Sequence, residues 1–174
     1  MPYIRDFDIR ATATVRRLPN SWQPFMSALT FLGEPLVVIA AGFAGFISAI
    51  NRSQDAVVKA FFYAAIAFCL STILKFILHR RRPNDLIIET LGIKSYSFPS
   101  GHAFGTVIFY GLFAYLDIKY LSSPWNYLFG IFITSVIFLI GISRIYLQAH
   151  YPSDVVGGWL LGGVSLAGII LLSF

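Results

Sequence analysis

Long apolar stretches separated by short polar connectors constrain this chain more than any other feature. Five of them cover residues 35–50, 56–78, 103–116, 125–142 and 155–174. A bilayer needs about 20 apolar residues per helix, so the first and third stretches are short. The third becomes long enough if its helix begins near Ser100. Because lipid offers no hydrogen-bond partners to the backbone, we expect an all-α, polytopic transmembrane helical bundle.

The amino-acid composition supports a membrane protein with one bundle. Charged residues make up 12% of the chain, hydrophobic residues 57%, and the mean hydropathy is +0.73, whereas soluble domains carry roughly 25% charged residues. The lone Cys69 lies in an apolar run and cannot form an intrachain disulfide. A net charge of +5 suits anionic headgroups or an anionic substrate equally well. We expect the bilayer as a partner and no nucleic acid.

The first 33 residues do not read as a spanning segment. Charges such as Arg5 and Asp8 interrupt apolar residues that recur at loosely helical spacing, among them Ile4 and Phe7. This pattern predicts an interfacial amphipathic segment over 1–33, followed by a transmembrane domain over 34–174. A cleaved signal peptide is disfavoured because the apolar run begins late and lacks a clear small-residue cleavage site.

Alternation of five spans brings three polar pieces of sequence to one membrane face. These pieces are the N-terminal segment, the connector 80–100 and the connector around His150. Arg52, the loop near Lys119 and the C-terminus fall on the other face.

The first of the polar motifs is KFILHRRRP, residues 75–83. Lys75 and Arg82 are seven residues apart, about two helical turns, so both can lie on one face and bind one anion. The alternative is that a cationic helix end anchors the protein at lipid headgroups.

The second motif is FPSGHAFG, residues 98–105. Ser100 is a natural helix cap, and Gly101 lets the backbone approach a ligand closely. The free N–H groups of such a helix start bind anions, and His102 in its first turn is placed to donate a proton. The alternative is a capping serine beside an interfacial histidine.

The third motif is SRIYLQAHYPSD, residues 143–154. Arg144 ends one apolar stretch, and Pro152 is a typical first residue of the next helix. Asp154 follows His150 by four residues, close enough to accept its ring N–H and leave the other nitrogen free as a base or nucleophile. An ordinary loop ion pair is the alternative.

Together, two histidines, a carboxylate, cations and a helix start predict a phosphoryl-transfer site that works without metal. His102, His150 and Asp154 offer three possible metal ligands, but the neighbouring Lys and Arg side chains would repel a metal cation.

These three motifs, K-x6-RP, PSGH and SR-x5-H-x3-D, resemble the signature of the type 2 phosphatidic acid phosphatase superfamily, which includes vanadium-dependent haloperoxidases. The resemblance implies that His150 forms a phosphohistidine, that Asp154 orients it and that His102 is the general acid. It also implies phosphate binding by Lys75, Arg82, Ser100, Gly101 and Arg144. Bacterial members usually have six membrane helices, one more than this chain predicts.

The sequence therefore predicts a membrane lipid phosphatase without a cofactor, and leaves the oligomeric state open. Undecaprenyl diphosphate is the favoured substrate, with phosphatidylglycerophosphate and phosphatidic acid as alternatives. A non-catalytic protein that binds anionic lipid would not need a paired His150. A haloperoxidase is disfavoured by the hydropathy, and a transporter by the lack of repeats.

We expect the cell membrane as the location, with the site facing outward as in similar proteins. The charge distribution opposes this orientation: ten of the 13 Lys and Arg residues map to the catalytic side, which the positive-inside rule places in the cytoplasm.

Overall fold

A computed structural model describes residues 2–83, 87–88, 93–94 and 96–174. Its helices and strands, in chain order, are α1 (Pro2–Val15), a 3-10 turn η1 (Asn20–Trp22), α2 (Gln23–Leu32), α3 (Pro35–Asn51), α4 (Asp55–Leu78), β1 (Ile87–Ile88), β2 (Ile93–Lys94), α5 (Gly101–Tyr120), α6 (Trp125–Tyr146) and α7 (Pro152–Ser173). The strands form one short antiparallel pair. The predicted all-α helical bundle is confirmed, with this pair as a minor addition.

Four helices in the described part of the chain are individually long and apolar enough to cross a membrane: α4, α5, α6 and α7. They match the last four stretches predicted from hydropathy. A fifth span is possible only as a broken one, in which Asn20–Leu32 and Pro35–Asn51 meet at an angle of 43°. The predicted stretch 35–50 is short because it forms only one arm of this bent pair.

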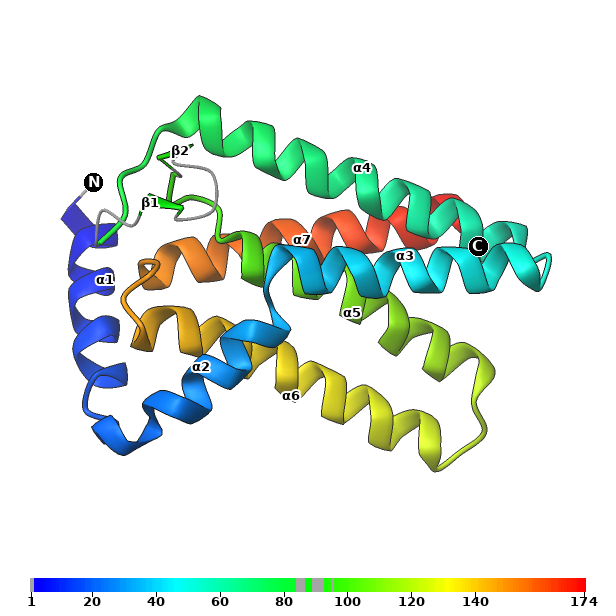
Figure 1. Cartoon of the computed structure of the whole chain (residues 1–174), viewed down its shortest axis with the longest axis horizontal. Coiled ribbons are helices and arrows are strands. Elements are labelled where there is room, and N and C mark those ends of the chain that lie inside the picture. Colours follow the sequence, from blue (N-terminus) through cyan, green and yellow to red (C-terminus); the bar gives the residue numbers. More distant parts are fainter. Residues whose placement is uncertain (1, 84–86, 89–92, 95) are drawn as a thin grey trace.

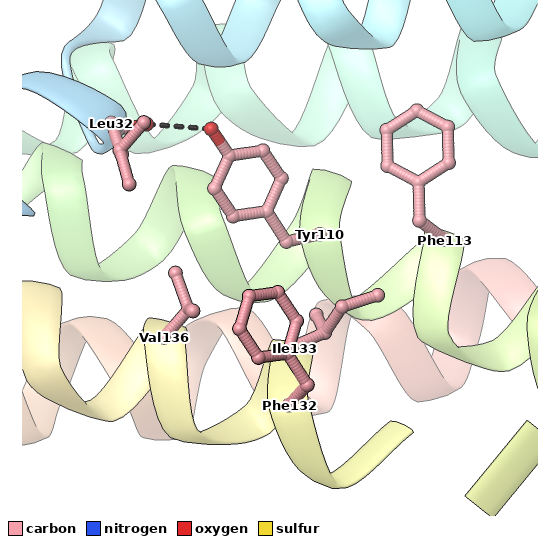
Figure 2. Close-up of a pocket in the computed structure, with 6 residues that line it drawn as sticks. All are labelled: Leu32, Tyr110, Phe113, Phe132, Ile133 and Val136. Carbon is pink, nitrogen blue, oxygen red and sulfur yellow. Dashed lines mark hydrogen bonds between the residues drawn. The ribbon is translucent and has the colours of Figure 1, made fainter. Parts of the chain in front are cut away.

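The break between α2 and α3 is held by a side chain of α5. The Tyr110 hydroxyl donates a hydrogen bond of 2.6 Å to the carbonyl oxygen of Leu32 (Figure 2). A carbonyl at a helix end has no partner within its own helix, so a tyrosine can satisfy it. The surrounding pocket, of about 230 Å³, is lined by Leu32, Tyr110, Phe113, Phe132, Ile133 and Val136 (Figure 2). This lining lacks charged groups, so the pocket is not the predicted anion site.

Helix α5 is the centre of the bundle, since it packs against α3, α4, α6 and α7. Phe104, Ile108 and Leu112 on α5 are buried in the main apolar core. The outer surfaces of the helices are apolar too: Val164 and Leu171 on α7 are 74% and 83% exposed. Apolar residues on both the inside and the outside of a helix are typical of a membrane span.

Helices α5 and α7 approach each other closely through two glycines of α7. A Cβ added at Gly158 would lie 2.9 Å from the Cβ of Ala103, and one added at Gly162 would lie 2.9 Å from the Cβ of Val107. Gly158 and Gly162 have the GxxxG spacing that allows close packing of membrane helices, and both pack here against α5. This contact also brings the starts of α5 and α7, which carry two of the three motifs, side by side.

The chain segments with polar motifs meet at one end of the bundle (Figure 1). Helix α1 lies across this end and contacts α6 and α7, and the connectors α4–α5 and α6–α7 are there as well. The α3–α4 and α5–α6 turns and the C-terminus lie at the opposite end. The division into an interfacial segment (1–33) and a transmembrane domain (34–174) stays a prediction. Helix α2, which belongs to the first of these parts, packs against α6 of the second.

Candidate active site

Asp154 is held at the start of α7 by a capping arrangement. Pro152 begins the helix, as predicted, and the Asp154 Oδ2 atom accepts a hydrogen bond of 2.9 Å from the backbone N–H of Tyr151. The backbone carbonyl of Asp154 accepts another, of 3.0 Å, from the N–H of Ser100 at the start of α5. The carboxylate is fully buried, so local sequence and the α5–α7 contact together determine its position.

His150 is buried beside this carboxylate, with its Nδ1 atom 3.7 Å from Asp154 Oδ2. This distance is longer than the direct hydrogen bond that the sequence predicts. Ser97 accounts for the difference: its hydroxyl donates to Asp154 Oδ2 and lies 3.4 Å from His150 Nδ1. Sequence analysis did not find Ser97, which lies two residues before the PSGH motif and looks there like an ordinary loop serine.

The three predicted cations, Lys75, Arg82 and Arg144, all act electrostatically on His150. Burial and, after it, the proximity of these cations lower the pKa of His150 from 6.5 to about 3, although Asp154 opposes the shift. The imidazole is therefore neutral near physiological pH. Neutral imidazole has a free lone pair, which a nucleophile needs.

Among the three cations, Arg144 gives the clearest indication of a bound anion, because one of its N–H groups is buried without an acceptor in the described residues. Its Nη1 atom donates to Thr30 Oγ1 at 2.6 Å, while its buried Nε–H has no acceptor among the residues that the structure describes. Buried arginine donors are normally satisfied. An anion bound beside His150 would provide the missing acceptor.

Lys75, Arg82 and Gly101 lie around the same space. Arg82 Nη1 donates to the carbonyl of Ala149 at 3.3 Å, next to His150. The Nζ atom of Lys75 is 3.6 Å from the point where a Cβ on Gly101 would be. Glycine thus leaves room between the lysine ammonium and the start of α5. The PSGH and K-x6-RP motifs face each other here, as a shared phosphate site requires.

At the start of α5, Ser100 caps the helix as predicted, since its Oγ accepts the N–H of Ala103 at 3.5 Å. His102 follows in the first turn, is 7% exposed, and lies within electrostatic range of Lys75. Its Nε2 atom is 3.1 Å from Glu34 Oε2. Glu34 was not found by sequence analysis, although an acidic residue between two short apolar runs marks the break between α2 and α3.

Two more charged residues at this site were not assigned from the sequence. Arg80 Nη1 donates to Asp154 Oδ1 at 2.5 Å, and Arg80 Nη2 donates to Asp8 Oδ2 at 2.7 Å. Asp8 is the buried acid of α1, while Asp6 on the same helix is exposed. Spacing along the chain offers no sign of this pairing.

A groove of about 1300 Å³ opens beside the site, between α1, the end of α4 and the start of α7. Ile4 and Phe7 of α1 and Leu160 of α7 are among its apolar lining residues, and Arg80 and Arg81 are among its charged ones. A groove lined by both apolar side chains and cations suits a lipid that carries an anionic head. Within the described parts of the chain, His, Cys, Asp and Glu side chains form no group of three or more that could hold a metal ion.

The chain is similar to a known family and to named members of it. The family model of the PAP2 superfamily matches residues 56–174, which include all three motifs. The chain is 30% identical over 141 residues to phosphatidylglycerophosphatase B of Bacillus subtilis (79% of this chain, 65% of that protein). It is 36% identical over 102 residues to undecaprenyl-diphosphatase of Sulfolobus acidocaldarius (56% of this chain, 45% of that protein).

The fold is similar to a solved structure as well. It superposes on the crystal structure of a transmembrane PAP2-type phosphatidylglycerolphosphate phosphatase from Bacillus subtilis with a TM-score of 0.80 and 25% identity, covering 99% of this chain and 87% of that one. The matched parts of the chain span about half to two thirds of the two curated relatives. On the family match and this likeness of fold, the chain belongs to the PAP2 superfamily.

Proposed function

We propose that the protein is a metal-independent membrane phosphatase that removes phosphate from a lipid phosphate or diphosphate through a phosphohistidine. One observation carries the proposal: a buried, neutral His150 faces three cations, one of which, Arg144, has a buried donor without an acceptor among the described residues. Cations that surround a nucleophile neutralise the oxygens of a phosphoryl group as it is transferred.

The geometry supports the following sequence of steps. His150 Nδ1 faces Ser97 and Asp154, which leaves Nε2 to attack phosphorus. A P–N bond forms as the bond to the lipid oxygen breaks, and His102 gives that oxygen its proton. Water then attacks phosphorus, His102 takes a proton from it, and the P–N bond breaks to release inorganic phosphate. Glu34 accepts a hydrogen bond from Nε2 of His102 and so stabilises the protonated ring, which gives its Nδ1 proton to the leaving oxygen and regains one from water.

The finer choice of substrate follows the sequence prediction, undecaprenyl diphosphate. The apolar groove beside Arg80 and Arg81 supports a lipid that enters from the side, and one relative is named undecaprenyl-diphosphatase. Another relative is named phosphatidylglycerophosphatase B, which makes phosphatidylglycerophosphate the main competitor. Neither name determines which lipid this chain accepts.

Purified protein in detergent tests both the chemistry and the substrate. We expect phosphate release from undecaprenyl diphosphate, phosphatidylglycerophosphate and phosphatidic acid, fastest from the first, and at the same rate with or without EDTA, since the charge that a metal would supply comes from Lys and Arg. Release that stops in EDTA and returns with a divalent cation would contradict the metal-independent mechanism. Binding of all three lipids without release would favour a non-catalytic lipid-binding protein.

We also propose that the protein lies in the cell membrane with this site facing outward. Labelling of single cysteines in intact cells by a membrane-impermeant maleimide measures the orientation, in a Cys69→Ser background. We expect Lys94→Cys, in the α4–α5 connector, to react, and Arg52→Cys, at the opposite end of the bundle, to be protected. Reaction at residue 52 and protection at residue 94 would place the site in the cytoplasm, as the count of Lys and Arg predicts.

A further inference from the structure

Asp8 is a buried carboxylate on a helix whose other charged residues face outward. It is 4% exposed, whereas its neighbours Asp6 and Arg10 on α1 are exposed. Burying a carboxylate is unfavourable unless it is paired and hydrogen-bonded. The partners of Asp8 therefore indicate why this acid is buried.

One group of partners belongs to the start of α7. Asp8 Oδ1 accepts the backbone N–H of Ser153 at 2.8 Å, and Asp8 Oδ2 accepts the Ser153 hydroxyl at 2.8 Å. The first N–H groups of a helix have no partner within the helix, and a carboxylate there also interacts favourably with the helix dipole. Asp8 thus caps α7 although it is 145 positions from Ser153 in the sequence. The capped residue, Ser153, directly precedes Asp154.

The other partner is Arg80, whose guanidinium lies between two carboxylates. Its Nη2 atom donates to Asp8 at 2.7 Å, and its Nη1 atom donates to Asp154 at 2.5 Å and to Ser153 Oγ at 2.8 Å. The guanidinium also stacks on the ring of Tyr151, 4.6 Å from its centroid. Since the guanidinium is a rigid planar fork, fixing Nη2 on Asp8 also fixes the direction in which Nη1 reaches Asp154.

We propose that Asp8 is a positioning residue for the reaction, which places the Asp154 carboxylate against His150 through Arg80 and Ser153. The inference rests on the proposed function in that it takes His150 as the nucleophile. Without the charge of Asp8, the whole positive charge of Arg80 acts on Asp154, which then supports a positive charge on His150 less well. The start of α7 also loses part of its cap.

This role separates two properties of the site. The hydrogen bonds that the structure shows for the Asp8 carboxylate go to Arg80 and Ser153. The side chains that we assign to the phosphate are different ones, those of Lys75, Arg82 and Arg144. Phosphate binding should therefore survive the loss of the Asp8 charge, while attack by His150 should not. A residue that only held α1 on the bundle would lower the amount of folded protein and affect both properties together.

The test compares Asp8→Asn, which is isosteric and uncharged, with Asp8→Glu and with Asp6→Asn, the same change at an exposed position of the same helix. For each variant we would measure kcat and KM with the lipid phosphate, the affinities for inorganic phosphate and orthovanadate, and the fraction of folded protein. Orthovanadate accepts a fifth bond from the nucleophile, so its affinity depends on the reactivity of His150. The affinity for inorganic phosphate depends instead on the phosphate-binding cations.

For Asp8→Asn we expect kcat to fall about 10- to 100-fold and orthovanadate to bind about tenfold more weakly, with KM and phosphate affinity within about twofold of wild type. Asp8→Glu restores part of kcat, and Asp6→Asn behaves like wild type. An unchanged kcat, equal weakening of phosphate and orthovanadate, or a loss that matches the folded fraction would overturn the inference. If wild type hydrolyses none of the lipids, the proposed function fails, yet the orthovanadate-to-phosphate ratio of Asp8→Asn still decides this one.

Discussion

Phosphate release should fall by about 10⁴-fold or more when His150 is replaced by asparagine, because His150 is the residue that we assign to form the covalent intermediate. Asparagine is close in size and carries no nucleophilic nitrogen. We would measure release from the best lipid substrate and trap the phosphoenzyme with radiolabelled phosphate, quenching in alkali because a phosphohistidine is labile in acid. Wild type should carry the label, and His150→Asn should not.

His79→Asn is the matched control, since His79 is an exposed histidine at the end of α4. Its backbone has a φ of 49°, a conformation that asparagine tolerates well. This variant should keep both activity and label. Label that persists in His150→Asn would identify another nucleophile, and release within about tenfold of wild type would exclude a covalent role for His150.

Replacing Arg144 with alanine should lower kcat/KM by about 10³-fold, the second largest effect we expect. Arg144 is half-buried at the end of α6. Its buried Nε–H group, which has no acceptor in the described residues, is the donor we assign to the phosphoryl oxygen. Losing one such donor in a dry site typically reduces the rate 10²- to 10³-fold, and the lost cation adds to this. Arg144→Lys should recover only part of the activity, because lysine lacks the planar fork.

Two controls separate this loss from damage to the fold. Thr30→Val removes the hydroxyl that accepts a hydrogen bond from Arg144 but leaves the cation, so its activity should fall much less. Arg52→Ala removes an exposed arginine of the α3–α4 turn, a turn that lies at the opposite end of the bundle, and should have no effect. Inorganic phosphate should bind Arg144→Ala much more weakly than wild type. Equal phosphate affinity in the two proteins would remove Arg144 from the site.

The structure agrees closely with the membrane spans predicted from the sequence, but the sequence predicted few of the contacts between side chains. Hydropathy predicted α4, α5, α6 and α7. Only the first predicted span differs, because α3 has the length of a span only together with α2, from which Gly33 and Glu34 separate it. A Cβ at Gly33 would overlap with Cγ2 of Ile140, so this break also packs tightly against α6. The periodicity of the sequence does not indicate that this break contributes a residue, Glu34, to the candidate site.

The same contrast holds within the candidate site. Spacing predicted that His150 and Asp154 lie together, four residues apart, and they do, at 3.7 Å. It did not predict that Ser97 would supply the hydrogen bond to the carboxylate, because a serine in a loop carries no local signature of its distant partner. Glu34 beside His102 was missed as well, because its place between two apolar runs marks a break in the helix but does not indicate a partner 68 residues away.

The sequence by itself determined the membrane class, the helical bundle and the three motifs, because each depends on hydropathy or on spacing within a few helical turns. Only the tertiary structure decided what surrounds Asp154: Ser97 from 57 residues away, Arg80 from 74, and Asp8, which reaches the neighbouring Ser153 from 145. Such pairs form because a buried charge must find compensating groups wherever the folded chain brings them. That requirement acts in space, so it leaves no pattern along the chain.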